Sequence, residues 1–252
     1  MTFALPVLFG LLIGLLLGLV GGGGSILTVP ILVYVLGQDV HAATATSLVI
    51  VALTALSGVL PHARAGRVAM PTALVFGGAG VAGAFVGTWL NARVSGPLIL
   101  FLFGLLMLIV AARMAFGRQA NVSETAHRQA AWPAAIGAGL AVGLMTGFFG
   151  VGGGFLIVPA LVLALGFPMR LAIGTSLVII AINSAAGVAA HLGSGQIDLG
   201  VALFFVVGGF AGANLGGHLA GRINEAKLSR AFAVMVALVG LYLVVQNGAA
   251  LA

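Results

Sequence analysis

The amino-acid sequence predicts an all-α polytopic membrane protein made of two inverted-topology repeats, with about 8–10 membrane segments. In each repeat a glycine-broken helical hairpin, a re-entrant segment, precedes three transmembrane helices. The first observation is composition: the 252 residues are 62% hydrophobic and 6% charged, with a mean hydropathy of +1.27. A soluble domain carries roughly 25% charged residues, so this chain cannot cover a water-exposed surface. The other observations are an internal duplication and the distribution of basic residues.

A shift of 129 positions aligns the two halves of the sequence without a gap. The stretch "VGGGGSILTVP" at Val20–Pro30 corresponds to "FGVGGGFLIVP" at Phe149–Pro159, and "TSLVI" after Ala45 recurs after Gly174. A match of this length indicates a duplication of about 120 residues. We therefore expect a first repeat at 1–117, a polar cytoplasmic linker at 118–131 and a second repeat at 132–252.

Each repeat begins with a long apolar run that glycines interrupt, at 3–36 and 132–165. The opening "MTFALPVLFG" has no basic stretch and no small-residue cleavage site, so we expect a retained first segment and not a signal peptide. Three uninterrupted spans follow in each repeat, each about 19–22 residues long, which is enough to cross roughly 30 Å of hydrocarbon. These spans are 41–61, 70–91, 97–116, 170–190, 199–220 and 228–246.

The basic residues favour a hairpin at each glycine-rich break. If each broken run crosses the membrane once, the ten Lys and Arg divide evenly between the two sides. If each run turns back at its glycines, nine of the ten lie on one side and Arg93 lies opposite. The positive-inside rule favours the second arrangement. A hairpin plus three crossings reverses the sidedness of the chain, which predicts inverted repeats, extracytoplasmic termini and a transporter with a midplane site.

The glycine-rich breaks are the first part of the predicted substrate site. Backbone that leaves helical geometry at membrane depth must be buried or must line a cavity, and glycine suits such turns. A helix that starts there directs free N–H groups and a positive dipole end into the interior, which favours an anion. We expect Ser25 to cap the first half-helix, whereas Gly154 holds that position in the second copy. The predicted binding residues here are Gly22, Gly23, Gly24, Ser25, Gly152, Gly153 and Gly154.

Neutral polar side chains form the second part of the predicted site. No Asp, Glu, Lys or Arg lies well inside a predicted span, whereas a cation carrier usually places a carboxylate there. Thr46 and Ser47, with their repeat partners Thr175 and Ser176, and the amide of Asn183 are predicted to bind substrate. The alternative for the hydroxyls is hydrogen bonding to backbone carbonyls or neighbouring helices.

His62 and His191 are repeat partners at span ends, on opposite faces of the membrane in this topology. They predict a proton-linked gate, or alternatively interfacial histidines without a mechanistic role. The chain has no cysteine, and no carboxylate pair or histidine cluster stands out, so we expect no catalytic site, metal or cofactor. We assign the net charge of +6 to membrane loops and not to a nucleic-acid partner.

Glycines recur at intervals of four in the predicted spans, and this spacing lets membrane helices pack closely. The same glycines would suit a homodimer in the lipid bilayer. These residues are Gly10, Gly14, Gly18, Gly83, Gly87, Gly139, Gly143, Gly147, Gly208, Gly212 and Gly216.

The glycine-rich break before "VP" in both halves, followed by "TATSLVI" and "IGTSLVI", resembles the TauE/SafE sulfite exporter family, also described as the toluene sulfonate uptake permease group. The resemblance covers essentially the whole chain. It implies a multi-pass transporter of small sulfur-containing anions, such as sulfite and organosulfonates, in a bacterial inner membrane. Ser25 against Gly154 departs from symmetry between the copies. A passive channel for a small solute and a non-transport membrane assembly factor are the alternatives.

Overall fold

The computed structural model describes residues 4–116, 132–150, 154–192, 197–220 and 225–248, and none of these residues lies in a strand. The prediction of an all-helical polytopic membrane protein is confirmed. Within the described ranges, six helices are long and apolar enough to span a bilayer: α3 (Val40–Arg64), α4 (Met70–Asn91), the Gly96–Arg113 part of α5 (Gly96–Phe116), α6 (Trp132–Phe149), α8 (Met169–His191) and α9 (Leu199–Ala220). The apolar helix α1 (Ala4–Val20) and the Ala233–Gly248 part of α10 (Glu225–Gly248) are shorter.

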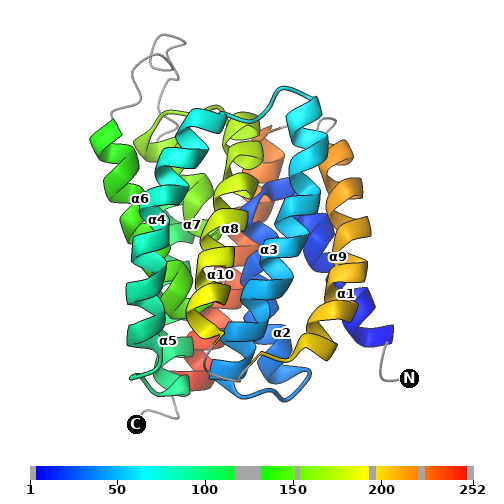
Figure 1. Cartoon of the computed structure of the whole chain (residues 1–252), viewed down its shortest axis with the longest axis vertical. Coiled ribbons are helices and arrows are strands. Elements are labelled where there is room, and N and C mark those ends of the chain that lie inside the picture. Colours follow the sequence, from blue (N-terminus) through cyan, green and yellow to red (C-terminus); the bar gives the residue numbers. More distant parts are fainter. Residues whose placement is uncertain (1–3, 117–131, 151–153, 193–196, 221–224, 249–252) are drawn as a thin grey trace.

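The first broken run folds back inside the bundle. α1 ends at Val20, and Gly21 turns the chain with a φ of +71°, a conformation that glycine adopts without steric cost. The 3₁₀ helix η1 (Gly22–Leu27) and α2 (Thr28–Tyr34) then lead back to the lower end of the bundle, where α1 begins (Figure 1). This is the hairpin that the charge distribution predicts.

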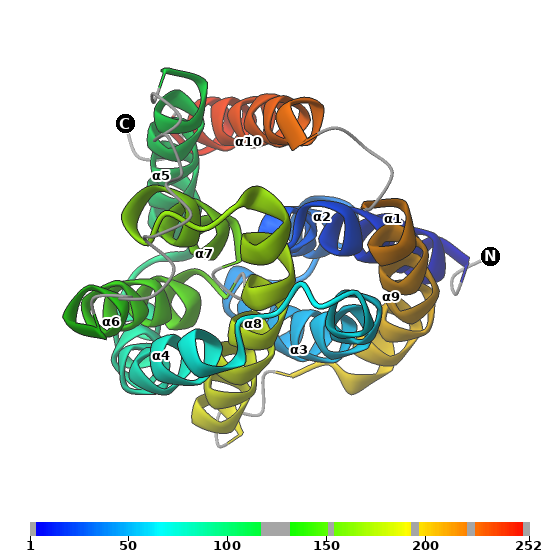
Figure 2. The same cartoon turned by 90° about the horizontal axis from the view of Figure 1, so that it is seen from above.

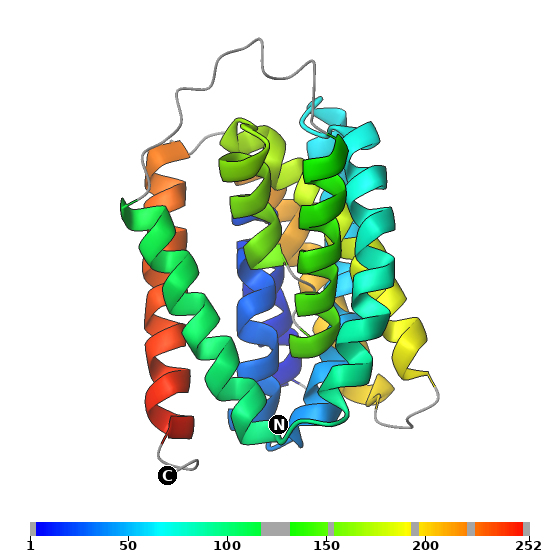
Figure 3. The same cartoon turned by 90° about the vertical axis from the view of Figure 1, so that its left-hand side faces the viewer.

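The second broken run has the same construction. α6 ends at Phe149, Gly150 has a φ of +67°, and α7 (Gly154–Pro159) continues into the π-helical turn η3 (Ala160–Ala164). Pro159 has no backbone N–H to donate, and the wider turn begins directly after it. In Figure 3, α6 begins at the upper end of the bundle, and the segment formed by α7 and η3 leads back to the same end.

Helices α3 and α8 lie side by side near the middle of the bundle when it is seen from above (Figure 2). α1 packs on α9, α6 packs on α4, and α5 packs on α10. The glycines at intervals of four lie in these contacts: a Cβ on Gly14 would overlap the Gly209 carbonyl, and a Cβ on Gly143 would overlap the Gly80 carbonyl. Their predicted role in close helix packing is confirmed. Each broken run therefore packs against a helix of the other half.

Candidate functional site

The two glycine-rich breaks meet in direct backbone contact. A Cβ on Gly22, at the start of η1, would overlap the backbone of Gly154, and a Cβ on Gly154 would overlap Gly22. Any side chain at either position would force the breaks apart. The first backbone N–H groups of two helical segments from different halves of the chain thus lie close together, where the partial positive charge of helix starts is concentrated.

A serine from each half lies against the break of the other half. The Ser47 hydroxyl can donate to the Thr44 carbonyl at 2.9 Å or to the carbonyl of Gly150. Its repeat partner Ser176 donates to the Ile173 carbonyl at 2.7 Å. A Cβ on Gly21 would lie 2.6 Å from the Ser176 oxygen. Both serines are fully buried, so their hydroxyls belong to the interior around the breaks.

The neighbouring threonines hold loops. The Thr46 hydroxyl oxygen accepts a hydrogen bond of 2.9 Å from the backbone N–H of Asp198, and the Thr175 oxygen accepts one of 2.9 Å from the N–H of Ala69. The two hydrogen bonds are equivalent under the duplication, since Thr175 lies 129 positions after Thr46 and Asp198 lies 129 positions after Ala69. The two serines thus show the hydrogen bonding to backbone carbonyls that the sequence leaves open as an alternative, whereas the two threonine oxygens accept from backbone N–H groups.

Asn183 differs from the hydroxyls because neither amide atom has a hydrogen-bond partner, although the residue is fully buried. Its side chain lies against Gly80, where a Cβ would collide with the amide. The hydroxyls of Thr54 and Ser184 are also buried without a partner. An unsatisfied buried polar group costs about 1–3 kcal/mol, so these atoms are candidates for contact with substrate or water.

The remaining glycine-break residues have different surroundings. The predicted cap at Ser25 is wrong: no side chain caps η1 or α2, and the Ser25 hydroxyl instead donates to the Gly22 carbonyl at 2.7 Å. Three residues separate these groups, so the hydroxyl bonds backward within its own turn. Gly24 packs against α1, where a Cβ would lie 2.6 Å from the Leu17 nitrogen. Gly23 lies in η1, while Gly152 and Gly153 lie outside the described residues.

The paired histidines lie at opposite ends of the bundle. His62, in the last turn of α3, is 1% exposed, and its Nε2 lies 2.9 Å from the carbonyl of Gly18 near the end of α1. His191, at the end of α8, is 4% exposed, and its Nδ1 lies 2.9 Å from the Gly187 carbonyl. His62 thus binds a broken helix directly, whereas His191 faces a pocket.

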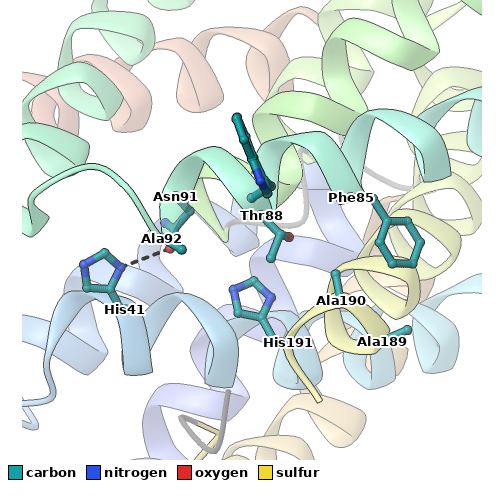
Figure 4. A pocket seen from close by; sticks show the side chains of 9 residues that line it. His41, Phe85, Thr88, Asn91, Ala92, Ala189, Ala190 and His191 are labelled. Atoms are coloured by element: carbon teal, nitrogen blue, oxygen red, sulfur yellow. Dashed lines mark hydrogen bonds between the residues drawn. The ribbon is translucent and has the colours of Figure 1, made fainter. Parts of the chain in front are cut away.

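That pocket has a volume of about 570 Å³ and lies where α3 begins and where α4 and α8 end (Figure 4). Of the sequence-predicted site residues it contains His191 alone. Its polar lining residues His41, Thr88 and Asn91 were missed by the sequence reasoning. The sequence could have identified two of them, because the repeats differ there: polar Thr88 and Asn91 correspond to Gly217 and Ala220 in the other half. The lining is His41, Phe85, Thr88, Trp89, Asn91, Ala92, Ala189, Ala190 and His191.

The buried interior of the described residues carries no formal charge of its own. Its polar side chains are hydroxyls, amides and the two histidines His62 and His191. The described residues hold no group of three His, Cys, Asp or Glu that could bind a metal ion. Selection for an anion in this interior must therefore come from backbone N–H groups, hydroxyls and amides.

Comparison with known proteins gives consistent matches. Residues 6–243 match the family described as "Sulfite exporter TauE/SafE". A "Probable membrane transporter protein" of Xylella fastidiosa is 38% identical over 249 residues, covering 96% of this chain and 95% of the relative. The "Probable membrane transporter protein YunE" of Bacillus subtilis is 28% identical, covering 98% and 99% respectively. No solved structure matches.

Proposed function

Since this chain belongs to the TauE/SafE family of membrane transporters, we propose that it moves small sulfur-containing anions by alternating access around the meeting point of its glycine-rich breaks. Sulfite, organosulfonates and related oxyanions are the proposed substrates. The observation that carries the proposal is the contact between Gly22 and Gly154, since it brings helix starts from both halves together. Such starts attract an anion without a buried cation.

The contact leaves no space for a substrate between Gly22 and Gly154, so the breaks separate when an anion binds. The hydroxyls of Ser47 and Ser176, which donate to backbone carbonyls in this state, then donate to the oxygens of the anion. A sulfite or sulfonate group offers three acceptor oxygens, and charge-assisted hydrogen bonds to it are about twice as strong as neutral ones. The unpaired amide of Asn183 supplies a further donor.

The proposed transport cycle uses inverted repeats in a bacterial inner membrane, with both termini extracytoplasmic. The support is the symmetry of the contacts, because the loop hydrogen bonds at Thr46 and Thr175 are related by the shift of 129. The helix pairs α1–α9 and α6–α4 are related in the same way. Inverted repeats can exchange conformations, so one arrangement opens the site outward and the other inward.

The test is flux through the purified protein in proteoliposomes. We expect sulfite or a small sulfonate to enter, and we expect a saturable counterflow of labelled anion against unlabelled anion trapped inside. A channel gives no counterflow, so flux without counterflow would replace the proposal with the passive channel. Vesicles that take up neither anion above protein-free controls would contradict anion transport itself.

A further inference from the structure

The pocket at the start of α3 and the ends of α4 and α8 has no role in the meeting of the breaks (Figure 4). We propose that it is an outer binding site for an organic anion with an apolar body, from which substrate passes to the breaks. This inference rests on the proposed transport function. In the proposed orientation the pocket lies at the extracytoplasmic end, which is also the end of Arg93.

The apolar walls fit a carbon skeleton. Phe85 and Trp89 project from α4 with 49% and 56% of their surface exposed, and three alanines complete this part of the lining. Ligand pockets of about 300–1,000 Å³ are lined mainly by apolar and aromatic groups with a few placed polar atoms. An inorganic oxyanion would leave these rings without a contact, so the walls favour an organic anion.

The polar lining can hold an anionic head. The Thr88 hydroxyl is buried and has no hydrogen-bond partner, so it can donate to a ligand oxygen. The Nδ1 of His41 lies 3.0 Å from the Asn91 side-chain oxygen and donates to it. Figure 4 shows His191 facing the same space from α8.

The charges around the pocket also favour an anion. The guanidinium of Arg93 lies 3.5 Å from the centre of the Trp89 ring and donates to the Trp89 carbonyl at 2.8 Å. Asp39 and Asp198 lie at this end of the bundle but do not line the pocket. The Asp39 carboxylate accepts two backbone N–H groups at the start of α3, and the Asp198 carboxylate accepts one at the start of α9.

One side chain connects the pocket to a break. Asn91 accepts from His41 through its oxygen and donates through its nitrogen to the Phe148 carbonyl at 2.7 Å. Phe148 lies in the last turn of α6, directly before the turn at Gly150. A ligand that displaces His41 therefore also acts on the end of the broken helix, which gives the pocket a route to the central site.

The second half of the chain does not repeat the residues that line this pocket. The positions that correspond to Thr88, Trp89 and Asn91 in the second half are Gly217, His218 and Ala220. There, Gly217 packs so closely that a Cβ would lie 2.9 Å from a ring carbon of Pro61. The two ends of the bundle are thus chemically different, and the donors and aromatic walls belong to one end.

The experiment uses Trp89 as the reporter. The chain has two tryptophans, so the Trp132→Phe variant leaves Trp89 as the sole tryptophan, which is excited selectively at a wavelength that tyrosine does not absorb. Benzenesulfonate is titrated into this protein in phosphatidylcholine nanodiscs while tryptophan emission is followed. We expect a saturable change, and an affinity about tenfold weaker in Thr88→Val, since a hydrogen bond to a charged group contributes about that factor. Thr72→Val, at the other end of α4, should bind as the parent does.

Equal affinity in Thr88→Val and Thr72→Val, or no saturable change at all, would overturn the proposal. An emission change that follows replacement of phosphatidylcholine by phosphatidylglycerol, and not addition of benzenesulfonate, would assign the pocket to lipid and overturn it too. Proteoliposome flux separates the two proposals. Anion flux without a Trp89 response refutes the outer site alone, whereas binding without flux of any anion refutes the transport function.

Discussion

The Ser47 hydroxyl has two backbone acceptors within reach. In this structure it can donate to the carbonyl of its own helix at Thr44 or to Gly150 at the break of the other half. A hydroxyl with two alternative acceptors keeps one of them when it turns to a substrate oxygen and back, so the cost of such a move is small. Ser57, ten residues along the same helix, also bonds a carbonyl three residues back, at 2.9 Å.

We therefore predict that Ser47→Ala and Ser57→Ala lose similar stability, about 0.5–1.5 kcal/mol each. Their transport rates should differ, with Ser47→Ala slowed about tenfold, which corresponds to about 1.4 kcal/mol in the barrier. Thermal unfolding and proteoliposome uptake on the same preparations measure the two quantities. Equal uptake by both variants would remove Ser47 from the site.

For Asn183 we expect a substitution to raise stability while it slows transport. Its buried amide is unpaired, so replacement by leucine removes an unsatisfied group worth about 1–3 kcal/mol. We predict that Asn183→Leu unfolds at a higher temperature and transports more slowly. Asn214→Leu is the control, because Asn214 lies half-buried on α9 and its side chain donates to the Phe210 carbonyl of its own helix. A slower but less stable Asn183→Leu protein would indicate damage to packing and not loss of a substrate contact.

Sequence reasoning at this scale succeeds where a residue is duplicated. Ser47 and Ser176 are found through the repeat, and both lie at the breaks. It fails at Ser25, because a capping role depends on backbone angles that no spacing reveals. It also misses His41, since this histidine acquires its partner Asn91 from a different helix, 50 residues away.

At the scale of elements, glycine decides which helices touch. Gly87 and Gly78 lie on the same helix, α4, but in different surroundings. A Cβ on Gly87 would overlap the Leu144 carbonyl of α6, whereas nothing lies within 4 Å of a Cβ on Gly78. The spacing of four identifies Gly87 from the sequence, and it leaves Gly78 outside the packing face.

We predict that Gly87→Ala destabilises the protein by about 1–3 kcal/mol, since added volume in a close contact displaces backbone. Gly78→Ala should stabilise it by about 0.5–1 kcal/mol, because alanine is the better helix former. Thermal unfolding in the same detergent measures both changes. Destabilisation by both substitutions would mean that α4 requires glycine for a reason other than its contact with α6.

Boundaries of uninterrupted spans follow well from hydropathy: the predicted 70–91 and 199–220 coincide with α4 and α9. The course of the two glycine-broken runs is harder to predict from hydropathy. α6 alone has 18 residues and enough hydropathy to count as a span, so length cannot show that the chain turns back after it. The distribution of basic residues supplies that information, because it reports the sides of the membrane and not the length of a segment.

At the scale of the whole molecule, the shift of 129 relates contacts as well as residues. The loop bonds at Thr46 and Thr175 and the positive φ angles at Gly21 and Gly150 are equivalent pairs. The pocket beside Thr88 departs from this symmetry. The two halves therefore match at their turns and loop hydrogen bonds and differ at the pocket beside Thr88, so the two ends of the bundle have different chemistry.

The chain has no cysteine, so single cysteines can report the sidedness of each loop. We predict that an impermeant maleimide labels Ser95→Cys and Leu192→Cys on intact cells, and labels Ala65→Cys after the membrane is opened. All three positions are exposed. Inversion places Ala65, after α3, and Leu192, after the equivalent helix α8, on opposite sides. Parallel repeats would place these two together and opposite Ser95. Labelling of Ala65→Cys alone on intact cells would keep the inversion and reverse the orientation inferred from the basic residues.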